Sequence, residues 1–313
     1  MGTTKYEGGD ERVICRLPPP KDQRGLKAFL WNPEAKTVLG RTGKSWAQIG
    51  VFYVIFYFCL ALYFSLLMFI FLRTLEPDTP KYTGADSLLT NPGLSFVPRT
   101  YHDELRPTII YDPTNDQSSS PYVNSINKLW KAYDPRPSNA VDCQNDGVFR
   151  KADDPPCLFD LAATNTSCSP DDRWGYNTNS PCILLKLNRM FHWRPQPPES
   201  FEGLPEGLRS YIFNKSSEDP ETALSQNAWV WCESEDVKIE QLSPGLPLSF
   251  FPYHMQEGYL SPLAPVRLLD LKAGQKVKVD CRVWAKNVEP KVGIRRTGQA
   301  SVWVELTGEA PSK

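Results

Sequence analysis

The chain has 313 residues, of which 23% are charged, and a formal net charge of −1 at neutral pH. Residues 1–45 contain nine of the 35 basic residues and five of the 36 acids, which leaves 26 basic and 31 acidic residues for the part after residue 45. This mildly acidic balance argues against nucleic acid or anionic lipid as the partner of that later part.

The first predicted element is a flexible tail over residues 1–25, where Gly8-Gly9 and Pro18-Pro19-Pro20 stand among charges. Apolar residues become frequent between Leu26 and Ser45, and we expect a short ordered segment at a membrane surface there. Tryptophan is enriched at membrane–water interfaces, and Trp31 and Trp46 suit that level.

The next element is a predicted membrane span. Its core, Ile49–Leu72, contains 24 residues and no charge. A helix of that length is about 36 Å long and crosses a hydrocarbon core of about 30 Å with some tilt. A cleaved signal peptide is disfavoured because the apolar core is too long and no small-residue cleavage site follows. We therefore divide the chain into a tail (1–45), a signal-anchor helix (46–73) and a third region (74–313).

The charges beside the span predict its orientation. The first 20 residues after it carry only Arg73 and Lys81, whereas the tail carries nine basic residues. Basic flanks stay in the cytoplasm, so we expect a single-pass type II protein with residues 74–313 outside.

The cysteines agree with that orientation. Six of the eight lie in the outer part, where an oxidising compartment favours three disulfides. Six cysteines allow 15 arrangements, and sequential pairing is the simplest of them. Two N-glycosylation acceptors, Asn165 and Asn214, also lie on the outer side.

The outer part predicts a mainly-β domain with one short helix. Ser120-Pro121 has the pattern of a helix start, and apolar residues recur at helical spacing from Val123 to Tyr133. Alternating apolar residues predict half-buried strands of an antiparallel sheet in four segments: 183–187, 228–232, 277–283 and 302–306. A Cys232–Cys281 bridge would tie two of these strands through the core, as in immunoglobulin-like sandwiches.

No motif marks a catalytic, metal or cofactor site. His102, His192 and His254 are scattered and no Cys-x-x-Cys occurs, so we expect no zinc. Type II topology also fits Golgi glycosyltransferases, but the Asp-x-Asp motif that commonly holds their metal–nucleotide sugar is missing. We therefore expect no enzyme activity and no cofactor.

Several long motifs resemble one family, the beta subunits of Na,K-ATPase. The resemblance runs from about Leu26 to Leu306. It rests on the cytoplasmic blocks 29–34 (FLWNPE) and 39–46 (LGRTGKSW), the span start 52–57 (FYVIFY), and the outer blocks 181–189 (PCILLKLNR), 251–253 (FPY), 259–263 (YLSPL) and 279–282 (VDCR).

The resemblance implies a non-catalytic subunit that escorts the catalytic alpha subunit of a P-type cation pump to the plasma membrane and tunes its potassium and sodium transport. It implies an immunoglobulin-like outer domain with long insertions, and the sequential bridges Cys143–Cys157, Cys168–Cys182 and Cys232–Cys281. The implied partners are the alpha subunit, the lipid bilayer and a small single-span regulatory subunit. The alternatives are the beta subunit of the gastric H,K-ATPase and a type II cell-adhesion glycoprotein acting without a pump.

The resemblance also indicates which residues contact the alpha subunit. In the span, Tyr53 and Tyr57 lie at i, i+4 on one face beside Phe52 and Phe56, and we interpret this stripe as packed on a partner helix. The alternative is an interfacial aromatic belt. Outside, the expected contacts are Phe251, Tyr253, Tyr259 and Leu260. Here the chain departs from the family, which usually has Tyr-Tyr-Gly-(Lys/Arg)-Leu after the Pro-Tyr, because Tyr253 is followed by 254–258 (HMQEG).

One pair of tryptophans stays open at this level. Trp229 and Trp231 lie on the strand face opposite Val230. Either further structure covers that face, or the pair is exposed and marks an interface.

Overall fold

The computed structural model divides the chain into two compact units, Met1–Leu75 and Glu76–Lys313. The predicted flexible tail, His102 and Asn165 lie outside the residues that the structure describes. The described residues are 29–33, 36–76, 79–84, 87, 90–99, 107–134, 137–143, 148–159, 167–215, 219–243, 245–288 and 297–308.

The first unit begins with a small antiparallel sheet, which agrees with the ordered segment expected before the span. Its three strands are β1 (Trp31–Asn32), β2 (Thr37–Val38) and β3 (Arg41–Thr42), in the order β1-β2-β3. The turn between β2 and β3 consists of Leu39 and Gly40, both with positive φ. Two-residue hairpin turns of this type need positive φ at both positions, and glycine adopts it without steric cost.

A single long helix, α2 (Gly43–Arg73), follows β3 directly. The Thr42 side chain accepts a hydrogen bond from Ser45 N and so caps the first turn. No residue of α2 is buried within the chain. Among the described residues, α2 is the one helix that is long and apolar enough to cross a membrane, and its bounds enclose the predicted span.

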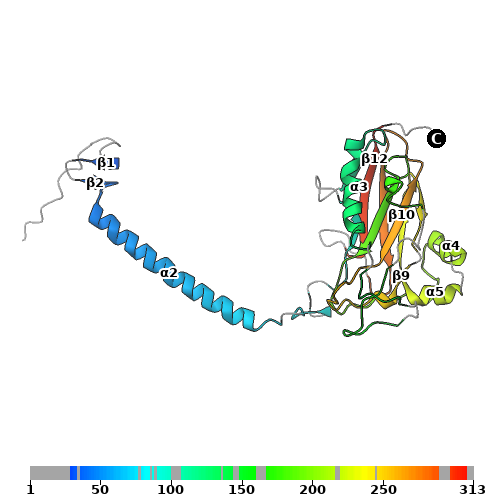
Figure 1. Cartoon of the computed structure of the whole chain (residues 1–313), viewed down its shortest axis with the longest axis horizontal. Coiled ribbons are helices and arrows are strands. Elements are labelled where there is room, and N and C mark those ends of the chain that lie inside the picture. The colour runs from blue at the N-terminus through cyan, green and yellow to red at the C-terminus, as the bar shows by residue number, and fades with distance from the viewer. Residues whose placement is uncertain are drawn as a thin grey trace, which may run out of the picture. The chain divides into compact units, whose positions relative to one another are not determined.

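The described strands of the second unit form two larger sheets (Figure 1). The four-stranded sheet has the order β4-β6-β10-β8 and the five-stranded sheet the order β5-β12-β11-β7-β9. The strands are β4 (Leu94–Val97), β5 (Thr108–Tyr111), β6 (Cys182–Leu187), β7 (Asn227–Glu233), β8 (Lys238–Gln241), β9 (Leu246–Pro247), β10 (Leu263–Leu269), β11 (Lys276–Trp284) and β12 (Gln299–Leu306).

All four predicted strand segments are confirmed, as β6, β7, β11 and β12. Along β11 and β12 buried and more exposed residues alternate strictly, as period-two patterning requires. By contrast, β6 is buried on both faces apart from Lys186, which is partly buried. Inward side chains of both sheets belong to one hydrophobic core, which includes Leu185, Val266, Val279 and Val304.

Two details of the predicted sheet are wrong. The sheet is not purely antiparallel, because β5 pairs with β12 in parallel. The Cys232–Cys281 bridge joins β7 and β11, which are neighbours in one sheet with the two cysteines directly opposite each other. The bridge therefore reinforces one ladder rather than linking two sheets.

The predicted helix is present, but it begins earlier than expected. Helix α3 runs from Asp116 to Trp130, and Pro121 lies inside it. Asn115 is the actual cap, since its side chain accepts from Gln117 N at 3.0 Å. Ser120 lies inside the helix, where its hydroxyl donates to Asp116 O, so Pro121 stands in the second turn and not at the first helical position.

Two short helices settle the question of the tryptophan pair. Helices α4 (Glu206–Lys215) and α5 (Pro220–Gln226) contribute Leu208, Ile212 and Leu224 to a second hydrophobic cluster that contains Trp229 and partly buried Trp231. Figure 1 shows α4 and α5 on one side of the sheets and α3 on the other. The outer face of β7 is therefore covered, and these tryptophans are core residues of the domain. Short 3₁₀ turns, η2 (Arg173–Gly175) and η3 (Leu248–Phe250), complete the described elements.

Candidate functional site

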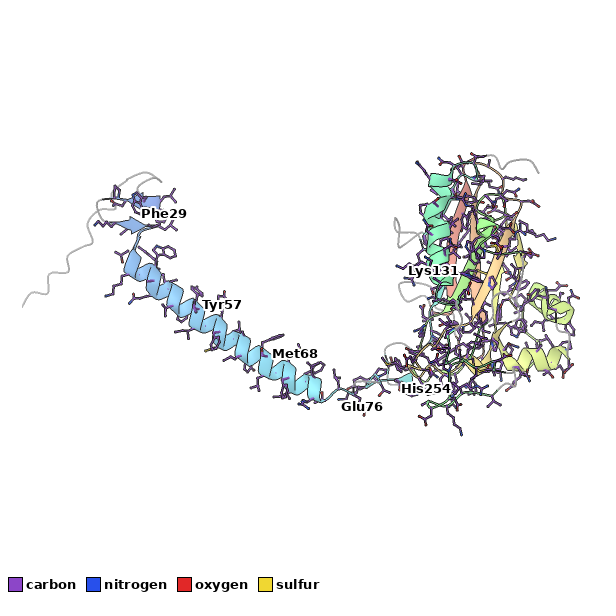
Figure 2. All side chains as sticks on the ribbon, in the orientation of Figure 1. Phe29, Tyr57, Met68, Glu76, Lys131 and His254 are labelled. Atoms are coloured by element: carbon purple, nitrogen blue, oxygen red, sulfur yellow. A yellow bond between two sulfur atoms is a disulfide. The ribbon has the colours of Figure 1, made fainter. Side chains whose placement is uncertain are left out.

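The aromatic stripe of α2 is the first candidate surface, and Figure 2 shows Tyr57 on this helix. Phe52 stacks on Phe56 with ring centroids 6.1 Å apart, and Tyr53 stacks on Tyr57 at 6.0 Å. These four side chains are between 48% and 62% exposed. The i, i+4 stacking confirms that each pair shares one helix face, and it leaves the rings available to lipid or to a second helix.

A cluster of aromatic rings around Arg189 is the second candidate surface. The Arg189 guanidinium lies 5.4 Å from the ring centroid of Tyr253 and 5.2 Å from that of Tyr259. Its Nη2 donates to the Tyr259 carbonyl oxygen at 2.8 Å. A cation held over ring faces and hydrogen-bonded to backbone fixes both tyrosines, which come from a segment about 65 residues away in the chain.

The same end of β6 is tied to the start of the sheet domain. Asn188 N donates to Gly93 O at 2.9 Å, one residue before β4 begins. The pKa of Lys186 is lowered mainly by burial and further by charge repulsion from Arg99 and Arg189. The Arg189 cluster therefore lies where the chain enters the sheets, and its surroundings are electropositive.

The four predicted outer contact residues fall into two classes. Phe251 and Tyr259 are buried, and the Tyr259 hydroxyl donates to Phe250 O at 3.1 Å. Burial raises the pKa of Tyr259 to about 12, so this hydroxyl stays neutral. Tyr253 and Leu260 are partly buried and keep exposed atoms. The first pair can position the surface, whereas the second pair can touch a partner.

The segment that departs from the family forms a tight loop beside this cluster. Asn139 Nδ2 donates to Glu257 O at 2.6 Å, and His254 N donates to the Gln256 side chain at 3.0 Å. Met255 has positive φ and is 55% exposed. The loop thus presents a flexible apolar side chain next to Tyr253.

The structure brings together two histidines that are 62 positions apart in sequence. The rings of His192 and His254 lie 5.0 Å apart, and Figure 2 labels His254 within the sheet domain. Burial lowers the pKa of His254, and His192 and Arg194 lower it further by charge repulsion. Treating the histidines as scattered was wrong for this pair. No local sequence pattern predicts the contacts of these histidines or of Arg189, because the contacts come from tertiary folding.

The cysteines pair sequentially, as expected. The disulfides are Cys143–Cys157, Cys168–Cys182 and Cys232–Cys281, and Cys59 on α2 is a free thiol. The acceptor Asn214 lies exposed in the last turn of α4. Within the described residues there is no group of three or more His, Cys, Asp or Glu side chains that could hold a metal ion.

Comparison with known proteins identifies one family. Residues 19–302 match the family model described as "Sodium / potassium ATPase beta chain". Every sequence block quoted above for the resemblance falls inside that range, which ends four residues before the end of β12.

Curated relatives match along nearly the whole chain. "Sodium/potassium-transporting ATPase subunit beta-1" of Drosophila melanogaster is 33% identical, over 97% of this chain and 99% of the relative. The subunit beta-1 of Tetronarce californica is 31% identical, over 94% and 99% of the two chains. The human subunit beta-2 is 27% identical, over 84% and 87%.

Proposed function

The chain belongs to the sodium/potassium ATPase beta chain family and is a non-catalytic accessory subunit of the pump, and from this premise we propose what it does there. We propose that it escorts the catalytic alpha subunit through folding to the plasma membrane and modulates potassium and sodium transport. The observation that carries the proposal is a membrane-length helix with an uncovered aromatic stripe, joined to a disulfide-bonded domain.

The proposed topology is type II, with residues 1–45 cytoplasmic, 46–73 in the membrane and 74–313 extracellular. Its support is the basic flank before α2 and the six disulfide-bonded cysteines after it, because disulfides persist in oxidising compartments. Asn214 is exposed and therefore open to glycosylation, and Asn165 is proposed as a second acceptor.

The proposed membrane contact with the alpha subunit is formed by Phe52, Tyr53, Phe56 and Tyr57. The rings project from a helix of which nothing is buried within this chain, so a partner helix can reach all four. A tyrosine hydroxyl deep in the hydrocarbon needs a hydrogen-bond partner, and a neighbouring span supplies one.

The proposed extracellular contact is formed by Tyr253 and Leu260, with Phe251 and Tyr259 holding them in place. Arg189 holds Tyr253 and Tyr259 in place by cation–π contacts to both rings and by a hydrogen bond to Tyr259 O. Exposed Met255 extends this surface, and its flexible thioether can adapt to the partner.

An immunoglobulin-like arrangement of the outer domain is also a proposal. Its support is the shared core of the two sheets, in which β6 and β10 are largely buried on both faces. The insertions α3, α4 and α5 fit the long additions that such a domain would carry.

Co-expression with an Na,K-ATPase alpha subunit tests the function. We expect the alpha subunit to co-purify with this chain in mild detergent, and ouabain-sensitive, potassium-activated current to appear at the cell surface. A chain that reaches the surface alone and never binds an alpha subunit would instead support an adhesion glycoprotein. Preferential assembly with the gastric H,K-ATPase alpha subunit would move the assignment to that pump.

Two phenylalanines on α2 offer a matched test of the membrane contact. Phe56 belongs to the proposed face, whereas Phe58 lies about 200° around the helix from it. Truncating an interface anchor costs about 1–2 kcal/mol, so we expect Phe56→Ala to weaken alpha co-purification about five- to thirtyfold. Phe58→Ala leaves the yield within about twofold. Equal losses for the two variants would contradict the assigned face.

A further inference from the structure

The segment before the span, which we call the hairpin segment (residues 29–33 and 36–46), exposes an unusual set of side chains. Six large apolar residues in this short stretch are between 39% and 58% exposed: Phe29, Leu30, Trp31, Val38, Leu39 and Trp46. Strand pairing β1-β2-β3 holds these residues in a defined shape. Some other surface must therefore cover them, because soluble surfaces rarely carry such a density of large apolar side chains.

The hairpin segment is attached rigidly to the span. Trp46 Nε1 in the first turn of α2 donates to Val38 O in β2 at 2.9 Å, and Leu39 N donates to Leu30 O at 3.2 Å. No linker intervenes, since β3 ends at Thr42 and α2 begins at Gly43. Wherever α2 lies in a bilayer, the hairpin segment lies against that bilayer's surface.

The depth of its basic residues matches the lipid headgroups. The apolar stretch begins at Ile49, directly after Gln48 and five residues after Lys44. Five residues of helix rise about 8 Å, and each headgroup layer is about 5–8 Å thick. Lys44 therefore reaches the phosphate level when Ile49 lies at the edge of the hydrocarbon core.

The net positive charge of the residues before the span is concentrated in and around the hairpin segment. Residues 26–48 carry four basic side chains against Glu34, whereas residues 1–25 carry five against four acids. Lys36, Arg41 and Lys44 lie on the structured hairpin itself. Aromatic side chains beside lysine and arginine are the composition of segments that bind anionic membrane surfaces.

We propose that the hairpin segment binds anionic phospholipid of the cytoplasmic leaflet. The rings of Phe29, Trp31 and Trp46 enter the headgroup layer, and Lys36, Arg41 and Lys44 contact lipid phosphate and carboxylate groups. The proposal rests on α2 spanning a bilayer, and only the choice of leaflet rests on the proposed topology. Anionic lipid is the favoured occupant over the cytoplasmic surface of a partner protein, because continuity with the span places the segment on lipid whether or not a partner is bound.

The test uses the full chain, without an alpha subunit, in nanodiscs. One set contains phosphatidylcholine alone, and in the other about a third of the lipid is phosphatidylserine, an anionic lipid. Quenching of Trp31 by lipid brominated near the headgroup is obtained as the difference between the natural chain and Trp31→Phe. We expect Trp31 to be quenched in both nanodiscs, and more strongly with phosphatidylserine.

Charge variants test which residues carry the anionic preference. Each basic residue near an anionic surface raises the affinity for that surface about fivefold. The variant Lys36→Gln/Arg41→Gln/Lys44→Gln should therefore lose the phosphatidylserine increment, that is, the extra quenching of Trp31 seen with phosphatidylserine. Lys36→Gln/Lys44→Gln, which leaves the Arg41–Ser45 hydrogen bond intact, should lose most of it. The matched control replaces three exposed lysines of the sheet domain, Lys128, Lys131 and Lys272, and should keep it. Salt near 1 M, where charges are screened beyond about 3 Å, should reduce it.

Three results would overturn the proposal. They are equal quenching in the two nanodiscs, extra quenching with phosphatidylserine that survives the charge variants, or a Trp31 that neither nanodisc quenches. The last result would mean that the segment does not lie on lipid and would leave a protein surface as the occupant. Since these nanodiscs hold no pump and carry anionic lipid in both leaflets, a negative result leaves the pump assignment and the topology untouched.

Discussion

At the scale of single residues, function depends on side chains that the fold either fixes or leaves free. Phe251 and Tyr259 belong to the same tyrosine- and proline-rich segment as Tyr253, yet they are buried while Tyr253 keeps exposed atoms. The Arg189 guanidinium lies against both tyrosines, and Phe251 packs against Trp193. A segment that resembles a contact motif therefore contains both positioning residues and contact residues.

Two glycines give a residue-scale prediction about stability. Gly175 and Gly203 have nearly equal positive φ, +75° and +78°, but a Cβ on Gly175 would meet Ser180 O at 2.1 Å and one on Gly203 would meet nothing within 4 Å. Positive φ alone costs about 1–2 kcal/mol for alanine, and the clash adds about 1–3 kcal/mol.

We therefore expect Gly203→Ala to lower the free energy of unfolding by about 1–2 kcal/mol and Gly175→Ala by about 2–5 kcal/mol. Urea unfolding of the detergent-solubilised chain, followed by tryptophan fluorescence, measures both. Equal losses would show that the backbone around Ser180 yields to the added methyl group.

At the scale of elements, α4 and α5 decide what the five-stranded sheet can do. Without them, Trp229 and Trp231 would form an exposed aromatic surface on β7. With them, Leu208, Ile212 and Trp229 form a cluster separate from the main core. The insertion therefore turns a potential interface into an interior and presents Asn214, at the end of α4, to solvent.

Truncating the covered tryptophan tests the role of this insertion. Trp229→Ala removes a side chain that is 3% exposed, and such truncations cost about 3–5 kcal/mol. Phe213, on the outer side of α4, is 52% exposed, so Phe213→Ala should cost less than about 1 kcal/mol. Thermal unfolding of the two variants separates a core role from a surface role. A mild effect of Trp229→Ala would mean that α4 and α5 leave the sheet easily.

At the scale of the whole molecule, the two units carry different kinds of partner surface. The described part of the first unit is a hairpin and a helix with no buried residue in the span, so the large side chains of the span face lipid or protein. The second unit has its own hydrophobic core and three disulfides. The subunit thus combines a helix that is stabilised by contact with lipid or a partner protein and a domain that is stabilised by its own core and disulfides.

Topology gives the prediction at this scale. In cells, glycosidase treatment should shift the chain to a lower apparent mass, and Asn165→Gln/Asn214→Gln should abolish the shift. Protease added to sealed microsomes should remove a tag at the N-terminus and spare the disulfide-bonded domain. Loss of that domain with the tag protected would reverse the orientation and with it the assignment of the extracellular contacts.

The sequence by itself determined the span, its flanking charges, the period-two strands and the family, because each is written in neighbouring residues or in long local motifs. Only the tertiary structure decided the parallel pairing of β5 with β12, the position of Cys232–Cys281 within one sheet, the burial of Phe251 and Trp229, and the meeting of His192 with His254. The local periodicity of apolar residues determines which side of a helix or strand is apolar. The segment that covers that side is determined by contacts between residues far apart in the chain.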